Sequence, residues 1–259
     1  MSGAATLRVE QLGMSFGGLK AVDQVDLEVP AGKITAIIGP NGAGKTTFFN
    51  VVAGFYAPTA GRVLIDDEDV SGLPPHKVAR LGVARTFQTT QLFPAASVLD
   101  NVIVGRRLHT RSNVFDAVLR SRRHRREEAE SRENALEALE FTGARDLADV
   151  LVANISQEAR KRVAVALALA TEPRVLLLDE PAAGINPHET EGLTALIRSV
   201  AVERGVTVCL VEHKMRMVMD LADHVAVLNY GKKIAEGPPA KIRSDPKVID
   251  AYLGADHDA

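Results

Sequence analysis

The chain has 259 residues, of which 31 are basic and 33 are acidic, and it contains 8 Phe, 3 Tyr and no Trp. The nearly neutral charge gives no overall attraction to nucleic acid, and the small number of aromatic side chains argues against a surface that stacks on bases. We therefore expect no nucleic-acid partner. A chain of this length is expected to form a single domain with lobes and a substantial core.

The sequence carries no pattern typical of secretion or of membrane insertion. Residues 1–6 lack a basic region followed by an apolar core, so they do not resemble a signal peptide. The longest apolar stretch, residues 163–170, is too short to cross a bilayer. Cys209 is the only cysteine, so no intramolecular disulfide is possible, and we expect its side chain in the core. These features predict a cytoplasmic protein that reaches a membrane only through partners.

A phosphate-binding pattern lies between a strand and a helix. Residues 34–38 form an apolar run typical of a buried strand, residues 46–53 are typical of a helix, and the segment between them matches the P-loop pattern G-x-x-x-x-G-K-[ST]. Its glycines would let backbone N–H groups surround phosphates, and the helix N-terminus would add partial positive charge. Lys45 would reach the β- and γ-phosphates, and the Thr46 hydroxyl would bind Mg²⁺. The sequence thus predicts that ATP or GTP is bound by Gly39, Pro40, Asn41, Gly42, Ala43, Gly44, Lys45, Thr46 and Thr47.

The flanking segments predict a second sheet and an inserted helical region. Residues 7–10 and 25–29 alternate apolar and polar side chains as half-exposed strands do, and residues 63–65 continue an antiparallel sheet. Residues 89–152 are charged, helical in pattern and poor in strand patterns. Their first half is basic through Arg106, Arg107, Arg111, Arg120, Arg122, Arg123, Arg125 and Arg126.

Two interpretations of this basic segment stay open. The first is a solvated helix whose arginines pair with acidic side chains four residues away, since residues 127–140 are acidic. The second is a basic face that lies near anionic lipid headgroups, where each Arg would add about 1 kcal/mol of binding free energy.

A second strand pattern indicates the chemistry of the P-loop. Residues 175–178 are apolar and lead directly into Asp179 and Glu180, as expected of a buried parallel strand that ends in carboxylates. Asp179 is placed to hold Mg²⁺, directly or through water. Glu180 can polarise the water molecule that attacks the γ-phosphate. Strands expected near residues 206 and 225 alternate with helices, which is typical of a parallel α/β sheet.

With these motifs in order, the chain resembles the nucleotide-binding subunit of an ABC transporter over nearly its whole length. The resemblance implies that Phe16 stacks on adenine, that Gln88 approaches Mg²⁺ and the attacking water, and that His213 contacts the γ-phosphate. It also implies that residues 181–187 form a loop at a dimer interface. The cofactors implied are ATP and Mg²⁺, with Thr46, Gln88 and Asp179 near the metal and Glu180, His213 and Gln88 near the reacting atoms.

The fold implied is a P-loop NTPase with a RecA-like parallel-sheet core, an antiparallel β subdomain and an inserted α-helical subdomain. We expect one ABC ATP-binding domain over residues 1–259. Its core lobe would take residues 1–88 and 160–235, its helical subdomain about residues 89–159, and its C-terminal helical tail residues 236–259.

Within the ABC transporters, the chain is more similar to the ATPases of branched-chain amino acid importers. The similarity rests on residues 84–88, 179–184 and 251–254 and on the Arg-rich insertion after residue 105. It implies transmembrane permease subunits and a second ATPase subunit as partners, and a peripheral location on the cytoplasmic face of the inner membrane. Relatives in this branch also serve amide and urea importers, so the transported molecule stays open.

The sequence departs from the family at the signature L-S-x-G-Q, which caps the nucleotide held by the opposite subunit. Ser156 is retained and is followed by Gln157, but Glu158 replaces the glycine and Ala159 replaces the glutamine. Two unit charges about 4 Å apart repel by roughly 4 kcal/mol at an effective dielectric constant near 20. A carboxylate facing a γ-phosphate would therefore weaken binding strongly, unless it points to solvent or is neutralised by Arg160 or Lys161.

The degenerate signature favours a heterodimer with an intact partner subunit, although a homodimer is possible. Three functions stay open: an ATP-hydrolysing importer subunit, a catalytically impaired nucleotide-binding subunit with a regulatory role, and a soluble ABC protein of translation or DNA repair. The last is disfavoured because such proteins usually carry two cassettes or longer insertions.

Overall fold

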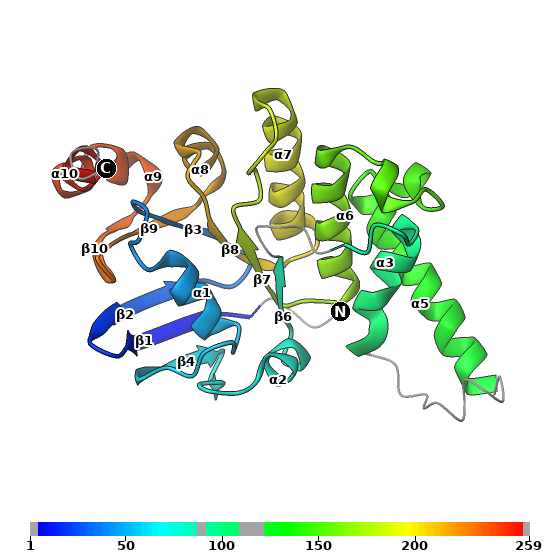
Figure 1. Cartoon of the computed structure of the whole chain (residues 1–259), viewed down its shortest axis with the longest axis horizontal. Coiled ribbons are helices and arrows are strands. Elements are labelled where there is room, and N and C mark those ends of the chain that lie inside the picture. The colour runs from blue at the N-terminus through cyan, green and yellow to red at the C-terminus, as the bar shows by residue number, and fades with distance from the viewer. Residues whose placement is uncertain (1–4, 87–91, 109–121, 256–259) are drawn as a thin grey trace. The chain divides into compact units, whose positions relative to one another are not determined.

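The computed structural model describes residues 5–86, 92–108 and 122–255, and these residues form two compact units (Figure 1). The first unit takes residues 1–88 and 174–259, and the second takes residues 89–173. This division differs from the expected boundary at residue 159, because helix α6 (Gln157–Ala170) belongs to the second unit. Its Val163, Ala166 and Ala170 share a buried apolar cluster with other helices of that unit.

The first unit contains an antiparallel sheet of four strands. β1 (Leu7–Phe16) pairs with β2 (Leu19–Val29) and with β4 (Ala60–Ile65), and β4 pairs with the short β5 (Glu68–Asp69). The inward-facing residues of β1 include Leu7, Val9 and Leu12, which are fully buried. The alternation seen in the sequence therefore places one face of this sheet against the core.

A six-stranded sheet forms the centre of the same unit, in the order β10-β9-β3-β8-β7-β6. Its strands are β3 (Ile34–Ile38), β6 (Val83–Thr86), β7 (Val175–Asp179), β8 (Thr207–Val211), β9 (His224–Asn229) and β10 (Lys232–Gly237). All neighbouring strands are parallel except β10, which runs antiparallel to β9. Every residue of β3, β7 and β8 is buried, as expected for parallel strands covered on both faces.

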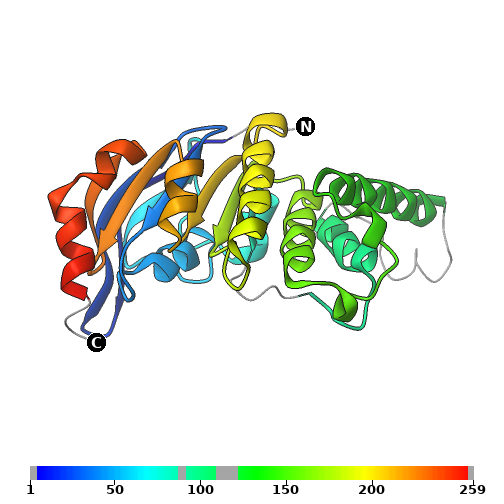
Figure 2. The same cartoon turned by 90° about the horizontal axis from the view of Figure 1, so that it is seen from above.

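Helices cover the two faces of this sheet. Figures 1 and 2 show α7 (Pro187–Glu203) and α8 (Met215–Leu221) on one face and α1 (Lys45–Val52) on the other. Phe48 and Phe49 of α1 are fully buried in a cluster that also contains Leu12 of β1 and Cys209 of β8. Burial raises the pKa of the Cys209 thiol, so this cysteine is a packed, neutral side chain.

Further helices complete the first unit. These are α2 (Pro75–Arg80), α9 (Pro239–Arg243) and α10 (Pro246–Ala255). The predicted combination of a parallel core sheet and an antiparallel β subdomain is confirmed. No helix in the described part of the chain is both long and apolar enough to cross a membrane.

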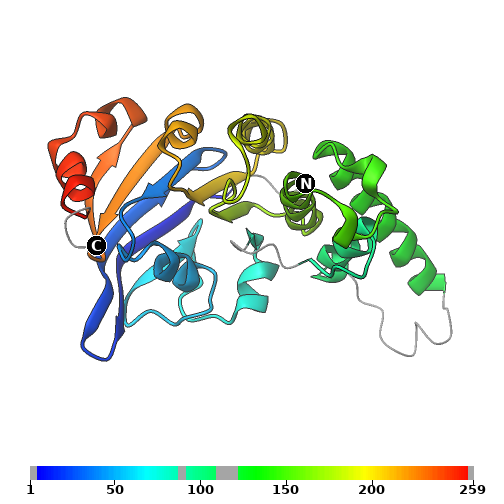
Figure 3. The ribbon, with the colours of Figure 1, turned by 45° about the horizontal axis from the view of Figure 1, so that its top comes forward.

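The second unit is helical (Figure 3). Its described residues form the α-helices α3 (Val98–Gly105), α5 (Arg122–Phe141) and α6 and the 3₁₀ turns η1 (Arg106–Leu108), η2 (Arg145–Leu147) and η3 (Val152–Asn154). Ser97 caps the N-terminus of α3, because its side chain accepts a hydrogen bond from the backbone N–H of Asp100. The apolar faces of the three helices meet in one cluster around Leu99 and Leu139.

The basic segment has two kinds of arginine. Arg123 and Arg126 of α5 pair with acidic side chains four residues later, which agrees with a solvated helix. Arg106 is instead buried, and it bonds the backbone oxygen of Ala170 and the Glu172 carboxylate. Arg111 and Arg120 lie outside the described residues.

We predict that Leu139→Ala lowers the free energy of unfolding by about 2–5 kcal/mol, because Leu139 is fully buried and its removal leaves a cavity. Urea denaturation followed by circular dichroism measures this loss. The control is Val202→Ala, since Val202 is 76% exposed and its truncation should cost less than about 0.5 kcal/mol. Equal effects of the two variants would contradict the core assigned to the second unit.

Candidate functional site

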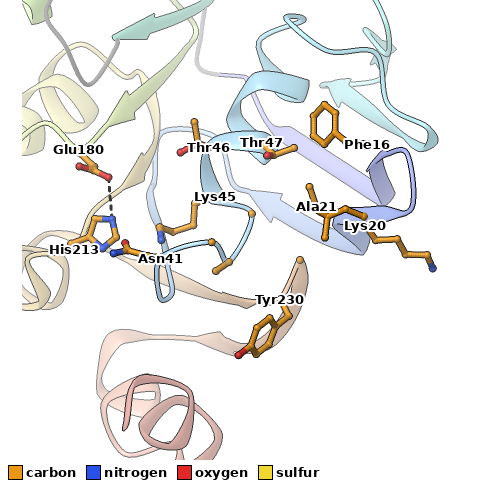
Figure 4. A pocket seen from close by; sticks show the side chains of 15 residues that line it. Phe16, Lys20, Ala21, Asn41, Lys45, Thr46, Thr47, Glu180, His213 and Tyr230 are labelled. Carbon is orange, nitrogen blue, oxygen red and sulfur yellow. Dashed lines mark hydrogen bonds and ion pairs between the residues drawn. The ribbon is translucent and has the colours of Figure 1, made fainter. Parts of the chain in front are cut away.

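Three predicted motifs meet at one edge of the six-stranded sheet (Figure 4). The P-loop follows β3, Glu180 follows β7 and His213 follows β8 after one further residue. These strands are parallel neighbours, so their carboxyl ends lie at the same edge. Ligands of open parallel α/β sheets bind at this edge.

Close backbone approaches explain two glycines of the P-loop. A Cβ atom on Gly39 would lie 2.0 Å from the Leu228 backbone oxygen, and one on Gly44 would lie 2.2 Å from that of Ala21. Gly44 has a φ of 99°, which is the left-handed region that favours glycine. The loop therefore packs tightly between β2 and β9, and its backbone is held in one conformation.

The Lys45 side chain folds back over the P-loop. Its Nζ atom donates hydrogen bonds to the backbone oxygens of Gly39 at 2.7 Å and of Pro40 at 2.8 Å. Burial lowers the pKa of the Lys45 ammonium, and the Glu180 and Asp179 carboxylates oppose part of this change. A cation held above the loop is suited to neutralise a phosphate group.

The P-loop borders a cavity of about 550 Å³. Residues 41–47 line it together with Phe16, Glu180, His213 and Tyr230. Phe16 is 44% exposed and its ring meets that of Tyr56 edge to face, with centroids 5.4 Å apart. An aromatic face is thus available at the cavity, on the side away from Glu180 and His213 (Figure 4). Gly39 and Pro40 do not line the cavity but hold Lys45.

The side chains of Glu180 and His213 are in direct contact at the wall of the cavity. His213 Nε2 lies 3.0 Å from Glu180 Oε1, and Figure 4 shows the two side chains beside Asn41 and Lys45. The backbone of Glu180 has a φ of 46°, which is uncommon for a residue with a side chain. Its N–H donates to the Val211 backbone oxygen at 2.9 Å, so the neighbouring strand stabilises this conformation.

Asp179 is held by an arginine that the sequence analysis assigned no role. Arg85 Nη2 lies 2.8 Å from Asp179 Oδ2, and Arg85 Nη1 donates to Asn50 Oδ1 at 2.7 Å. The guanidinium also lies 5.7 Å from the ring centroids of Phe49 and Phe55. Arg85 belongs to residues 84–88, which carried the family resemblance, but nothing local in the sequence links it to Asp179.

A second overlooked residue is Glu212, which is 2% exposed. Its Oε1 accepts the N–H of Ala182 at 2.8 Å, and its Oε2 accepts those of His213 at 2.9 Å and Lys214 at 3.0 Å. A carboxylate at the end of an otherwise apolar strand is the signal that could have identified it.

The signature residues lie in the second unit. Ser156 caps α6 by accepting the N–H of Ala159 at 3.2 Å, and Gln157 is exposed. Glu158 accepts a hydrogen bond from Arg162 Nε at 2.8 Å, one helical turn away. The partner of Glu158 is thus Arg162 rather than Arg160 or Lys161, since Arg160 bonds the Ala153 backbone oxygen.

Among the described residues, no group of three or more His, Cys, Asp and Glu side chains could hold a metal ion by itself. The oxygen atoms of Thr46 and Asp179 suit a hard cation such as Mg²⁺, which usually binds with few protein ligands, substrate phosphates and water. The remaining predicted metal contact, Gln88, lies outside the described residues.

We predict that Gly44→Ala weakens ATP binding at least tenfold, because the new Cβ would overlap the Ala21 backbone and force the loop to move. Isothermal titration calorimetry measures the dissociation constant. Gly18→Ala is the matched control, since a Cβ there meets no atom within 4 Å and its φ is not left-handed. A Gly44→Ala protein with unchanged affinity would show that the loop tolerates displacement.

Comparison with known proteins identifies the family. The model of the ABC transporter family matches residues 22–183, and that of the branched-chain amino acid ATP-binding cassette transporter matches residues 232–258. The chain is 44% identical to the high-affinity branched-chain amino acid transport ATP-binding protein BraF of Pseudomonas aeruginosa, over 96% of the chain and 97% of the relative. It is 42% identical, with the same coverage, to the corresponding protein LivG of Escherichia coli K12.

Solved structures agree with this assignment. An ATP-binding cassette of an ABC transporter in its ADP conformation is 32% identical, with a TM-score of 0.84 over 96% of this chain and 99% of that one. A nucleotide-free cassette is 33% identical, with a TM-score of 0.84 over 96% and 98%. Together with the P-loop, Glu180 and His213 at one cavity, these similarities show that the chain belongs to the branched-chain amino acid transport ATP-binding proteins of the ABC transporter family, as an ATPase subunit.

Proposed function

We propose that this ATPase subunit powers the import of branched-chain or related amino acids and that residues of the P-loop cavity carry out its reaction. The observation that carries the proposal is the meeting of the P-loop, Glu180 and His213 at one cavity of about 550 Å³. The names of the 42–44% identical relatives support the class of transported molecule.

Nucleotide binding would use the backbone of the P-loop and the start of α1. The N–H groups of the loop and the helix N-terminus attract the phosphates. Lys45 would exchange its bonds to the Gly39 and Pro40 oxygens for bonds to the β- and γ-phosphates. Phe16 would stack on the adenine, which its exposed ring at the cavity permits.

Mg²⁺ fits the donor set that this site offers. The Thr46 hydroxyl and the Asp179 carboxylate would hold it together with phosphate oxygens and water. Gln88, which is not among the residues that the structure describes, would approach the ion as well. When bound, the ion neutralises charge on the phosphates. Arg85 would keep the Asp179 carboxylate oriented, because its bond engages Oδ2.

Glu180 would act as the general base for the attacking water. His213 would contact the γ-phosphate and keep the Glu180 carboxylate oriented through their 3.0 Å contact. The Lys45 ammonium, which also lines the cavity, would balance part of the negative charge that collects there.

The proposed partners are transmembrane permease subunits and a second ATPase subunit, which would place the protein at the cytoplasmic face of the inner membrane. In the family's dimer, each signature caps the nucleotide of the opposite subunit. The substitution Glu158 favours a heterodimer with a subunit of intact signature, while a homodimer is the alternative.

A regulatory subunit with impaired hydrolysis is the second candidate function, and Glu158 is the observation that favours it. Its bond to Arg162 reduces the expected repulsion of a γ-phosphate, but the side chain still occupies the place of a glycine. The two candidate functions differ in whether ATP is hydrolysed at the P-loop cavity of this chain. Variants of Glu180 and Glu158 distinguish them.

We predict that Glu180→Gln lowers ATP turnover by at least about a hundredfold while ATP binding is preserved, because the amide cannot accept the proton of water. The closed, ATP-loaded dimer should accumulate, as size-exclusion chromatography with ATP measures. Lys45→Ala should instead weaken ATP binding by roughly 10- to 100-fold, since it removes a charged hydrogen-bond donor. Glu203→Gln, on the exposed end of α7, is the control. Near-normal hydrolysis by Glu180→Gln would remove this residue from the reaction.

We predict that Glu158→Gly combined with Ala159→Gln strengthens ATP-dependent dimerisation and raises hydrolysis at the nucleotide that this signature caps. Arg162→Gln should have the opposite effect, because it leaves the Glu158 charge unpaired. Analytical ultracentrifugation with ATP and steady-state hydrolysis measure both changes. Hydrolysis at the P-loop cavity of this chain should change little, because the signature that caps it comes from the partner. Unchanged dimerisation in the glycine variant would show that Glu158 does not face the nucleotide.

A further inference from the structure

The turn that follows β7 is joined to the turn that follows β8 by the side chains of Glu212 and Lys214, which flank His213. Glu212 accepts the Ala182 N–H with one carboxylate oxygen and the N–H groups of His213 and Lys214 with the other. Lys214 Nζ donates to the Ile185 backbone oxygen at 2.8 Å and lies 3.1 Å from Thr190 Oγ1.

Burying the Glu212 carboxylate between the two turns costs solvation free energy. It is 2% exposed, and burial of a carboxylate is unfavourable unless hydrogen bonds replace its water. Here three backbone N–H groups do so, and bonds from N–H donors to an ionised carboxylate are among the strong hydrogen bonds of proteins. An apolar side chain could fill the same space, but it could not fix the two turns relative to each other.

The two turns carry the pair that faces the cavity. Glu180 lies two residues before Ala182, and His213 directly follows Glu212. The position of each backbone segment therefore decides whether His213 Nε2 can lie 3.0 Å from Glu180 Oε1. A shift of about 1 Å in such a pair can cost on the order of a hundredfold in rate.

We propose that Glu212 and Lys214 are positioning residues that hold Glu180 and His213 in register for ATP hydrolysis. This inference rests on the roles proposed above for Glu180 and His213. Neither Glu212 nor Lys214 lines the nucleotide cavity, so both act on turnover and not on ATP binding.

The variant that tests this inference is Glu212→Gln, which keeps the shape of the side chain. Its amide oxygen can satisfy His213 and Lys214, and its NH₂ group then faces the Ala182 N–H, so donor meets donor. The substitution thus breaks the bond between the turns while it preserves those within the second turn. We expect kcat to fall at least tenfold, with the dissociation constant for ATP changed less than twofold.

Non-additivity separates positioning from a general loss of stability. In a His213→Ala background, Glu212→Gln should lower kcat less than twofold further, because the register of an absent side chain no longer matters. A full tenfold loss in that background, or a wild-type kcat for Glu212→Gln alone, would overturn the proposal. If instead Glu180→Gln and His213→Ala themselves retain normal turnover, the proposed catalytic assignment fails, whatever Glu212→Gln does.

Lys214→Met provides a second test that leaves the Glu212 bonds in place. It removes the donor to Ile185 and Thr190, and we expect kcat to fall at least threefold with unchanged ATP affinity. An unchanged kcat would exclude Lys214 from the role. The matched control is Glu189→Gln. It alters the carboxylate that accepts the Asn186 N–H at the start of α7, and it leaves the Glu212 and Lys214 bonds between the two turns in place. Its kcat should stay within twofold of the wild type.

Discussion

The parallel pairing of β3, β8 and β7 is the constraint on which the site depends. Side by side and in the same direction, these strands bring the P-loop, the Asp179–Glu180 pair and His213 to one edge, although the residues are up to 174 positions apart in the chain (213 − 39 = 174). The strands consist mostly of buried apolar side chains, so the hydrophobic effect stabilises the pairing. The P-loop, Glu180 and His213 come after the ends of these strands, where they line the cavity.

Charges around this edge are buried in pairs or under backbone groups. Lys45 lies on two carbonyl oxygens, Asp179 is bonded to Arg85, and Glu212 is covered by three N–H groups. Such arrangements add little to stability compared with apolar packing. What they provide is orientation, which a reaction between phosphate and water requires. The Glu180 backbone, at a positive φ, fits the same picture of local strain held in place by its neighbours.

The first turn of α6 stabilises the Glu158 side chain that stands in place of the signature glycine. Ser156 still caps α6, and Glu158 sits in the first turn, where the helix dipole favours a negative charge. Its ion pair with Arg162 is half-buried and follows the i,i+4 geometry. The cap and the ion pair thus accommodate Glu158 within the helix of the second unit.

The sequence by itself predicted a P-loop, the Asp179–Glu180 pair and a parallel α/β core, because these follow from local patterns of strand, turn and helix. The resemblance to ABC transporters then implied the family and the role of His213. The i,i+4 rule could also have selected Arg162 as the partner of Glu158. Only the tertiary structure decided that α6 belongs with the other helices, that Arg85 holds Asp179 and that Glu212 joins two turns. The Arg85–Asp179 bond spans 94 positions and the Ala182–Glu212 bond spans 30. The physical reason is that a buried charge takes whichever partner the packed chain brings within hydrogen-bonding distance, and no periodicity along the sequence encodes that choice.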